Sequence, residues 1–185
     1  MTDPGPGPEP GALVGYRHPN GMTLPLPAGW EHVEDPRPDV ALIAVEPAAP
    51  PGGGEPGFRP NLVVTVDQLP SGQDLEEWQA ATEKMLPSML TEYLPIDLER
   101  LEIGGVAAIR RLAHHRSQAG TSVTMEQWTT VVPAVGGASL TGWSLTASTA
   151  TDAYPGLADL LAEVAGRWRP PGHSAPEAPT AAGTP

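Results

Sequence analysis

The sequence predicts an α+β domain in which one antiparallel sheet of six to seven strands is sandwiched by helices. Three observations support this fold class. The expected elements run as three strands, a helix, four strands and a final helix. Turn residues that favour hairpins separate most of the strands. At least one strand alternates apolar and mixed positions, a pattern typical of antiparallel sheets. Such an order indicates strands and helices segregated into layers.

The first three strands are expected within residues 21–33, 39–47 and 61–69. The first ends in a Pro-Ala-Gly-Trp turn, and a loop rich in proline and glycine occupies 47–57. The third strand follows the sequence "GFRP" and alternates clearly. One of its faces carries Leu62, Val64 and Val66, and the other carries Val63, Thr65 and Asp67. This strand is therefore expected to have one buried face.

A helix is expected over 74–86, with a further turn up to about Tyr93. Asp74 and Glu77 match a capping box at its start. Pro87 removes one backbone hydrogen bond, so it is expected to kink or restart the helix. A buried stripe at helical spacing is predicted for Leu75, Trp78, Thr82, Met85 and Met89.

Four strands follow as two hairpins, at 96–103, 106–116, 121–132 and 138–148. Gly104 and Gly105 suit the tight turn between the first two, because glycine adopts positive φ without strain. The final helix is expected within 152–169. Its predicted buried stripe consists of Leu157, Leu160, Leu161, Val164 and Trp168.

Composition sets the domain limits and excludes several classes of function. Of the 185 residues, 13–169 are expected to form one domain, and 1–12 and 170–185 to be disordered tails. A net charge of −12 disfavours nucleic acid as a partner, because phosphate binding needs a basic surface. The sequence contains no cysteine, no export signal and no apolar stretch long enough for a membrane span. We therefore expect a cytoplasmic protein.

Several segments together resemble a known family. They are "LPLPAGW", "FRPNLVVTVDQLPSGQDLEEW", "LEIGGVAAIRRLAHH" and the terminal amphipathic helix. Over residues 20–169 they resemble the PsbP-like α/β/α sandwich family, which includes PsbP, the Ran-binding Mog proteins and DcrB. The segment "FRPNLVVTV...DLEEW" is most similar to the actinobacterial LpqN-like branch, although the chain lacks the export signal of that branch. The shared motifs are structural, not catalytic.

The resemblance implies a non-enzymatic binding module. Members of this family act as adaptors, chaperones or scaffolds, and some bacterial relatives hold hydrophobic segments of secreted effectors. The expected partner is thus an apolar segment of another protein, and the expected role is that of a chaperone or adaptor, with secretion as one setting. An alternative is a lipid or small-hydrophobe binding protein with a pocket between helix 74–93 and the sheet.

The residues offer little to support catalysis, and no cofactor or metal is expected. His114 and His115 are adjacent on a predicted strand, so their side chains point to opposite faces and cannot serve one site. A hydrolase that uses His115 remains a third alternative, which requires a nearby carboxylate and an open cleft. The sequence lacks the recognised nucleophile, zinc, phosphate-loop and dinucleotide motifs.

Four residues are candidates for binding a partner. Trp128 and Trp143 lie directly opposite if the hairpin turns between Val135 and Gly136, and they then form either a core anchor or an exposed aromatic platform. Arg59 and Asn61 begin a strand beside a long loop, where polar side chains contact either a ligand or the loop itself.

Charged side chains on the paired strands have a simpler interpretation. Register from the Gly104–Gly105 turn places Glu99 opposite Arg110, and register from the loop 117–120 places Arg111 near Glu126. Such cross-strand pairs stabilise a sheet without any ligand.

Overall fold

A computed structural model describes residues 11–48, 57–134 and 139–172 of the chain. Most of the two predicted tails, most of the loop 47–57 and the predicted Val135–Gly136 turn lie outside these residues.

The described strands form two antiparallel sheets. The smaller sheet pairs β1 (Leu13–Arg17) with β2 (Thr23–Pro27). The larger sheet has seven strands, in the spatial order β3 (Glu31–Arg37), β4 (Val40–Val45), β5 (Asn61–Gln68), β9 (Leu140–Ala150), β8 (Ser122–Pro133), β7 (Val106–Arg116) and β6 (Thr91–Ile103). The helices are α1 (Leu75–Met89) and α2 (Tyr154–Arg167). The α+β class and the seven-stranded antiparallel sheet predicted from the sequence are confirmed.

Two strands were not expected. β1 contains a glycine, and β3 has the sequence "EHVEDPR", in which every residue is exposed. Neither shows the apolar alternation that marks a strand locally. Both form because they pair with apolar neighbours, β2 and β4, so their conformation depends on tertiary contacts.

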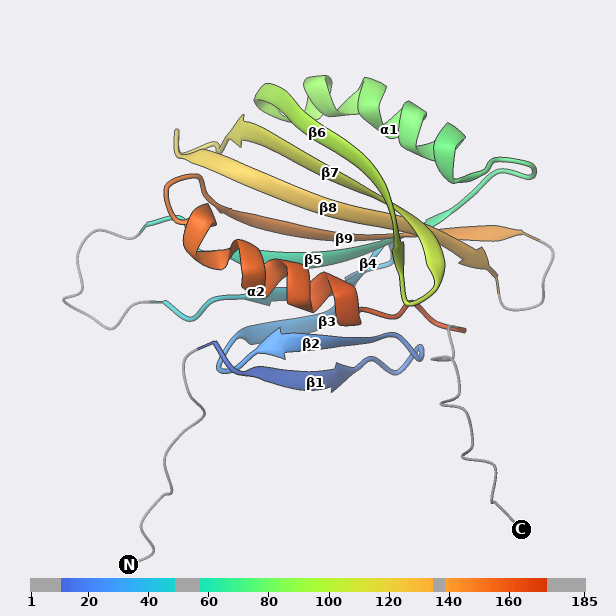
Figure 1. Cartoon of the computed structure of the whole chain (residues 1–185), viewed down its shortest axis with the longest axis horizontal. Coiled ribbons are helices and arrows are strands. Elements are labelled where there is room, and N and C mark those ends of the chain that lie inside the picture. The colour runs from blue at the N-terminus through green and yellow to red at the C-terminus, as the bar shows by residue number, and fades with distance from the viewer. Residues whose placement is uncertain (1–10, 49–56, 135–138, 173–185) are drawn as a thin grey trace, which may run out of the picture.

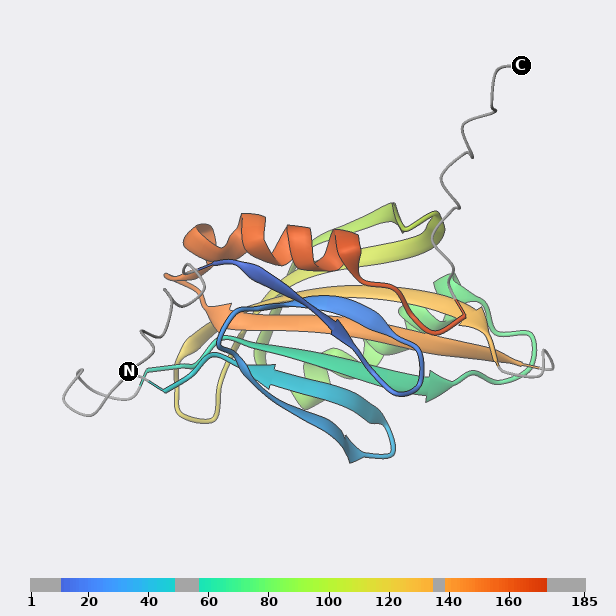
Figure 2. The same cartoon turned by 90° about the horizontal axis from the view of Figure 1, so that it is seen from below.

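The large sheet is covered on both faces (Figures 1 and 2). α2 and the β1–β2 sheet lie on one face, which we call the α2 face. α1 lies on the opposite face, the α1 face, where it packs on β6, β7 and β8. An isolated bridge between Thr23 and Arg169 joins the chain after α2 to β2. The fold is thus a sandwich of three layers.

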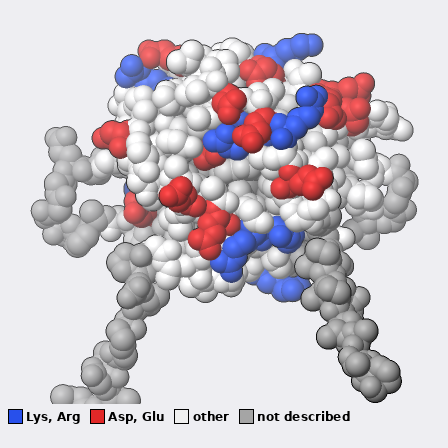
Figure 3. All heavy atoms as spheres, in the orientation of Figure 1, with Lys and Arg blue, Asp and Glu red and all other residues white. Residues whose placement is uncertain are grey.

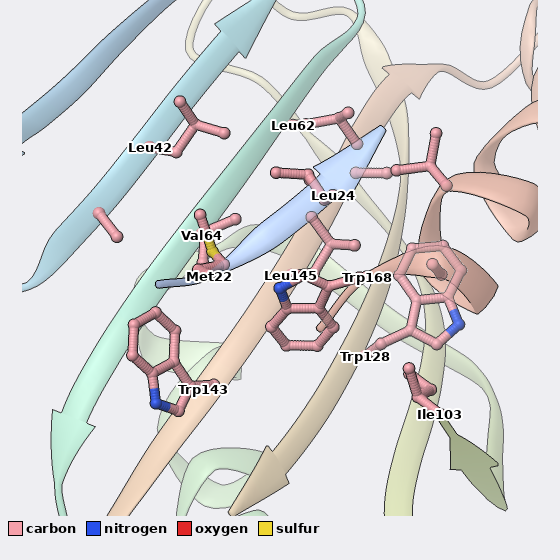
Figure 4. Close-up of a cluster of buried hydrophobic side chains, with 14 of the residues drawn as sticks. Met22, Leu24, Leu42, Leu62, Val64, Ile103, Trp128, Trp143, Leu145 and Trp168 are labelled. Carbon is pink, nitrogen blue, oxygen red and sulfur yellow. The ribbon is translucent and has the colours of Figure 1, made fainter. Parts of the chain in front are cut away.

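The main core lies between the large sheet and α2 with β2 (Figure 4). The alternation predicted for β5 is confirmed, because Leu62 and Val64 are fully buried in this core and Val66 packs against it. Trp168, the C-cap residue of α2, is also fully buried there. Three of the tryptophans, Trp128, Trp143 and Trp168, belong to this single cluster.

The buried stripe of α1 differs from the prediction. The buried residues are Leu75, Trp78, Gln79 and Leu86, whereas Met85 and Met89 are exposed. The side of α1 that faces the sheet is therefore not the side that was predicted. One of the buried residues on this side of α1 is polar. It is Gln79, whose Oε1 atom accepts a hydrogen bond from the Thr129 hydroxyl of β8.

The ends of α1 confirm one prediction and correct another. The Asp74–Glu77 capping box is present. Pro87, however, does not end or restart the helix, which continues to Met89. Pro87 lies in the last turn, so it removes only one helical hydrogen bond and leaves few residues beyond it to destabilise.

Gly142 of β9 provides the space into which Trp78 of α1 packs. A Cβ atom at Gly142 would lie 2.6 Å from the Trp78 ring, too close for any real contact. We expect Gly142→Ala to lower the free energy of unfolding by about 1–3 kcal/mol, the usual cost of overpacking a core.

Thermal or urea denaturation measures this loss, and Gly166→Ala is the matched control. Gly166 lies in α2, where an added Cβ meets nothing within 4 Å, so alanine there should preserve or raise stability. Equal stability of Gly142→Ala and the wild type would show that α1 does not pack as described.

Candidate functional site

Trp128 and Trp143 share the α2 face but are not directly opposite each other. Trp128 pairs with Leu145, and Trp143 pairs with Thr130, so the predicted register is wrong by two residues. The assumed turn falls within 135–138, which the structure does not describe. The side chains are 3 % and 5 % exposed, the burial expected of core anchors. They therefore offer no exposed platform.

Arg59 and Asn61 are engaged in contacts near the start of β5. The Arg59 guanidinium donates to the backbone oxygen of Glu46 at 2.7 Å and to the Glu31 carboxylate at 3.1 Å. The Asn61 amide donates to the Arg59 backbone oxygen at 3.2 Å. Trp143 pairs with Val66, near the other end of β5, so the structure does not bring the four candidates together.

Most of the exposed large apolar side chains lie elsewhere, on α1 and β6. Seven large hydrophobic side chains are exposed among the described residues, and five of them belong to these two consecutive elements. On β6 they are Leu94, Ile96 and Leu98, which are 58 %, 48 % and 56 % exposed. We call these three residues and the outer edge of β6 the β6 surface.

Two register shifts in β6 place the exposed apolar side chains on both faces of the sheet at its edge. The register shifts twice, between Thr91 and Leu94 and between Pro95 and Asp97. Leu94 consequently pairs with His114 and Leu98 with Arg111, two residues on opposite faces of β7. From Asp97 to Ile103 the pairing is regular. Apolar side chains thus flank the edge on both faces, beside a regular stretch of strand.

The edge of β6 is open, since β6 ends the sheet and pairs only with β7 among the described strands. The other edge strand, β3, is also open but carries mainly charged residues, a proline and one exposed apolar residue, Val33. Charges, prolines and bulges protect sheet edges from unwanted pairing. β6 has a proline and bulges near its start but a less charged, more apolar edge than β3.

Acidic side chains surround the β6 surface. β6 contains Glu92, Asp97, Glu99 and Glu102, against one basic residue, Arg100. The predicted Glu99–Arg110 pairing is confirmed, and the Arg110 guanidinium contacts Asp97, Glu99 and the buried Glu126. Burial by itself lowers the pKa of Arg110, but the hydrogen bond and charge of Glu126 outweigh it and leave the pKa raised.

The second predicted charge pairing needs correction. Arg111 faces Gln127 across the β7–β8 hairpin, and the Glu126 carboxylate binds Arg110 and Tyr154 instead. Arg116 pairs with Ser122, so the connection between these strands has one residue more than the predicted 117–120 loop, and the register moves by one residue.

Acidic and basic side chains are interspersed over the α2 face (Figure 3).

A pocket of about 440 Å³ lies between α1 and β6, beside Leu98. Its place matches the alternative prediction of a pocket between helix 74–93 and the sheet. The lining differs from that of an apolar cavity, because it contains five charged residues in addition to Leu98 and Ile109. The charged residues are Glu76, Glu83, Lys84, Glu99 and Arg100. Charges of both signs at its walls favour a polar or amphipathic occupant over a lipid chain.

Beneath α1, a buried arginine links the helix to the sheet. Arg111, almost fully buried, lies 2.8 Å from the Glu83 carboxylate and donates to Gln127 at 2.8 Å. Tyr93 of β6 donates to Glu83 at 3.3 Å. Burial, together with Glu83, raises the pKa of Tyr93, although Arg111 opposes this. These contacts fix α1 beside the β6 surface.

Metal-binding groups do not gather in the part of the chain that the structure describes. No cluster of three or more His, Asp or Glu side chains there could hold a metal ion. His114 and His115 pair with Thr124 and Val123, in successive register positions that face opposite sides of the sheet. Within the same residues, no helix is long and apolar enough to cross a membrane.

These features define a PsbP-like α+β sandwich with an open, partly apolar sheet edge. LpqN, involved in cell envelope biogenesis of Mycobacterium tuberculosis, is similar in structure with a TM-score of 0.63 and 18% identity, over 85% of this chain and 89% of LpqN. Cyanobacterial PsbP (CyanoP) from Synechocystis sp. PCC 6803 is similar with a TM-score of 0.62 and 16% identity, over 91% and 97%.

The Saccharomyces cerevisiae Ran-binding protein Mog1p is a third similar structure, with a TM-score of 0.53 and 14% identity, over 85% of this chain and 95% of Mog1p. The chain therefore has the PsbP-like fold. No family model and no curated protein matches the sequence.

The β6 surface was not predicted from the sequence, because the predicted strand begins at Ile96, whereas β6 begins at Thr91. One signal was present. Leu94, Ile96 and Leu98 alternate around Pro95, and proline inside a strand is confined to edges or bulges. Alternating apolar residues around a proline could have identified an exposed edge strand.

Proposed function

We propose that this protein is a non-enzymatic binding module that adds an extended segment of a partner protein to the edge of β6. The observation that carries the proposal is the exposure of three large apolar side chains along an open strand edge. In strand addition, main-chain hydrogen bonds supply affinity and pockets for side chains supply specificity. Asp97–Ile103 supplies the regular edge, and the pocket beside Leu98 receives one side chain.

The chemistry of β6 defines the partner segment. Leu94, Ile96 and Leu98 favour apolar side chains in the partner segment. The excess of acidic residues on β6 favours basic side chains in the same segment. The net charge of −12 would steer a basic segment toward the protein. The partner is thus an extended segment in which apolar and basic residues are interspersed.

The similarity to Mog1p supports a protein partner, because Mog1p is a Ran-binding protein. It does so only through the fold, since the identity is 14%. A role as a cytoplasmic chaperone or adaptor, with secretion as one setting, extends the same proposal and is supported by the sequence resemblance. The exposed apolar edge fits such a role, because a chaperone or adaptor must leave a binding surface unoccupied until its partner arrives.

Site-specific photo-crosslinking in the native host tests the proposal. A photoreactive amino acid at position 96 should crosslink to a protein, whereas the same amino acid at position 33 should not. Val33 is the matched control because it is a similarly exposed apolar residue, 57 % exposed, on the opposite edge strand. Mass spectrometry of the crosslinked peptide then identifies the partner segment.

A second substitution links the crosslink to the β6 surface. Leu98→Asp places a charge beside the proposed apolar contacts and should reduce crosslinking at position 96 by about tenfold or more. Val33→Asp should leave it unchanged. Absence of any crosslink at position 96, or equal crosslinking at positions 33 and 96, would contradict the proposal.

A further inference from the structure

A second pocket, of about 690 Å³, lies at the end of the sheet where β5 and β8 end and β9 begins. We call it the sheet-end pocket. Its apolar walls include Val66, Val106, Val131, Val132 and Trp143. None of its lining residues belongs to the β6 surface or to the pocket beside Leu98. Any ligand of the sheet-end pocket is thus independent of the proposed strand addition.

The described lining of the sheet-end pocket contains no charged or ionisable residue. Its polar side chains are those of Asn20, Gln68 and Thr141, which are neutral hydrogen-bonding groups. This lining contrasts with the charged pocket beside Leu98. A ligand that carried a charge into the sheet-end pocket would lose hydration without gaining a counterion.

Trp143 supplies an unused hydrogen-bond donor at this end of the sheet. Its side chain is buried, and its indole nitrogen Nε1 has no hydrogen-bond partner among the described residues. The nitrogen lies on the side of the ring that points toward the ends of β5 and β8 (Figure 4), where Val66 and Gln68 line the pocket. A buried donor without a partner costs free energy, and an acceptor that reaches it recovers part of that cost.

We propose that the sheet-end pocket binds an uncharged small molecule with an apolar body and a hydrogen-bond acceptor such as a ketone, ester or amide carbonyl. The volume lies in the range of small-molecule sites, which combine apolar walls with a few polar groups. The neutral lining and the net charge of −12 both disfavour carboxylates and phosphates. The acceptor matches the Trp143 N–H group.

Titration with three compounds of similar shape tests this proposal: acetophenone, benzoate and cumene. The readout is the set of indole N–H resonances of the protein labelled with nitrogen-15 tryptophan, with the Trp143 resonance assigned by Trp143→Phe. Acetophenone should shift the Trp143 resonance in a saturable manner. Cumene, which lacks an acceptor, should bind about fivefold more weakly. Benzoate, which adds a charge, should give no saturable shift at the same concentration.

A cavity-filling variant places the binding in the sheet-end pocket. Ala134→Phe puts a ring into the lining and should abolish the acetophenone shift, whereas Ala162→Phe, at an exposed position of α2, should preserve it. The unperturbed tryptophan resonances report whether each variant is folded. Binding of benzoate or cumene as tight as that of acetophenone, or no shift of Trp143 with acetophenone in the wild type, would overturn the proposal.

Discussion

Replacing Trp168 with alanine is expected to lower the free energy of unfolding by about 3–5 kcal/mol, the range for removing a large aromatic side chain from a core. Trp168 is fully buried and belongs to the core cluster that joins α2, β2 and the large sheet. It immediately precedes Arg169, which bridges to Thr23 of β2. Its loss therefore loosens both the end of α2 and the β1–β2 sheet.

Trp168→Phe separates packing from hydrogen bonding. The Trp168 Nε1 atom has no hydrogen-bond partner among the described residues, so phenylalanine removes volume but no bond. We expect a smaller loss than with alanine, measured by urea denaturation of both variants. A similar loss for both variants, or a negligible loss for Trp168→Ala, would contradict the packing described for α2.

Replacing Arg110 with methionine is expected to cost about 3–5 kcal/mol, because it leaves the buried Glu126 carboxylate without its cationic partner. The remaining bond to Glu126 that the structure shows comes from the Tyr154 hydroxyl, at 3.1 Å. Arg100→Met is the matched control, since its ion pair with Glu76 is exposed on both sides. Loss of such a surface pair costs about 0–1 kcal/mol.

The cost of Arg110→Met should depend on the presence of Glu126. The double variant Arg110→Met with Glu126→Leu should recover much of the stability at neutral pH. A loss that is unrelieved in the double variant would contradict the pairing of Arg110 with Glu126.

The sequence predicted the fold where its signals were local. The alternation in β5, the capping box of α1 and the Gly104–Gly105 turn all depend on neighbouring residues, and the structure shows each of them. Prediction failed where the answer depended on distant partners. The charged strand β3 forms because it pairs with β4. The side of α1 that packs on the sheet depends partly on Gly142, which leaves space for the Trp78 ring.

The candidate binding residues show the same division. The assumed hairpin turn placed Trp128 and Trp143 on one face, but only the fold shows that α2 and β2 cover that face. The β6 surface was not predicted, for the opposite reason. Leu94, Ile96 and Leu98 look like ordinary core residues until the strand order places β6 at an edge. Edge position is a property of the topology, and Pro95 is the local sign of it in the sequence.

Hydrogen–deuterium exchange of the protein with and without its crosslinked partner segment tests the central claim most directly. If the segment adds to β6 as a strand, backbone amides at the outer edge of Asp97–Ile103 become protected, because they gain hydrogen-bond acceptors. Amides of β3, at the opposite edge, should exchange unchanged. Protection confined to β3, or binding without any protection of β6, would contradict strand addition at this edge.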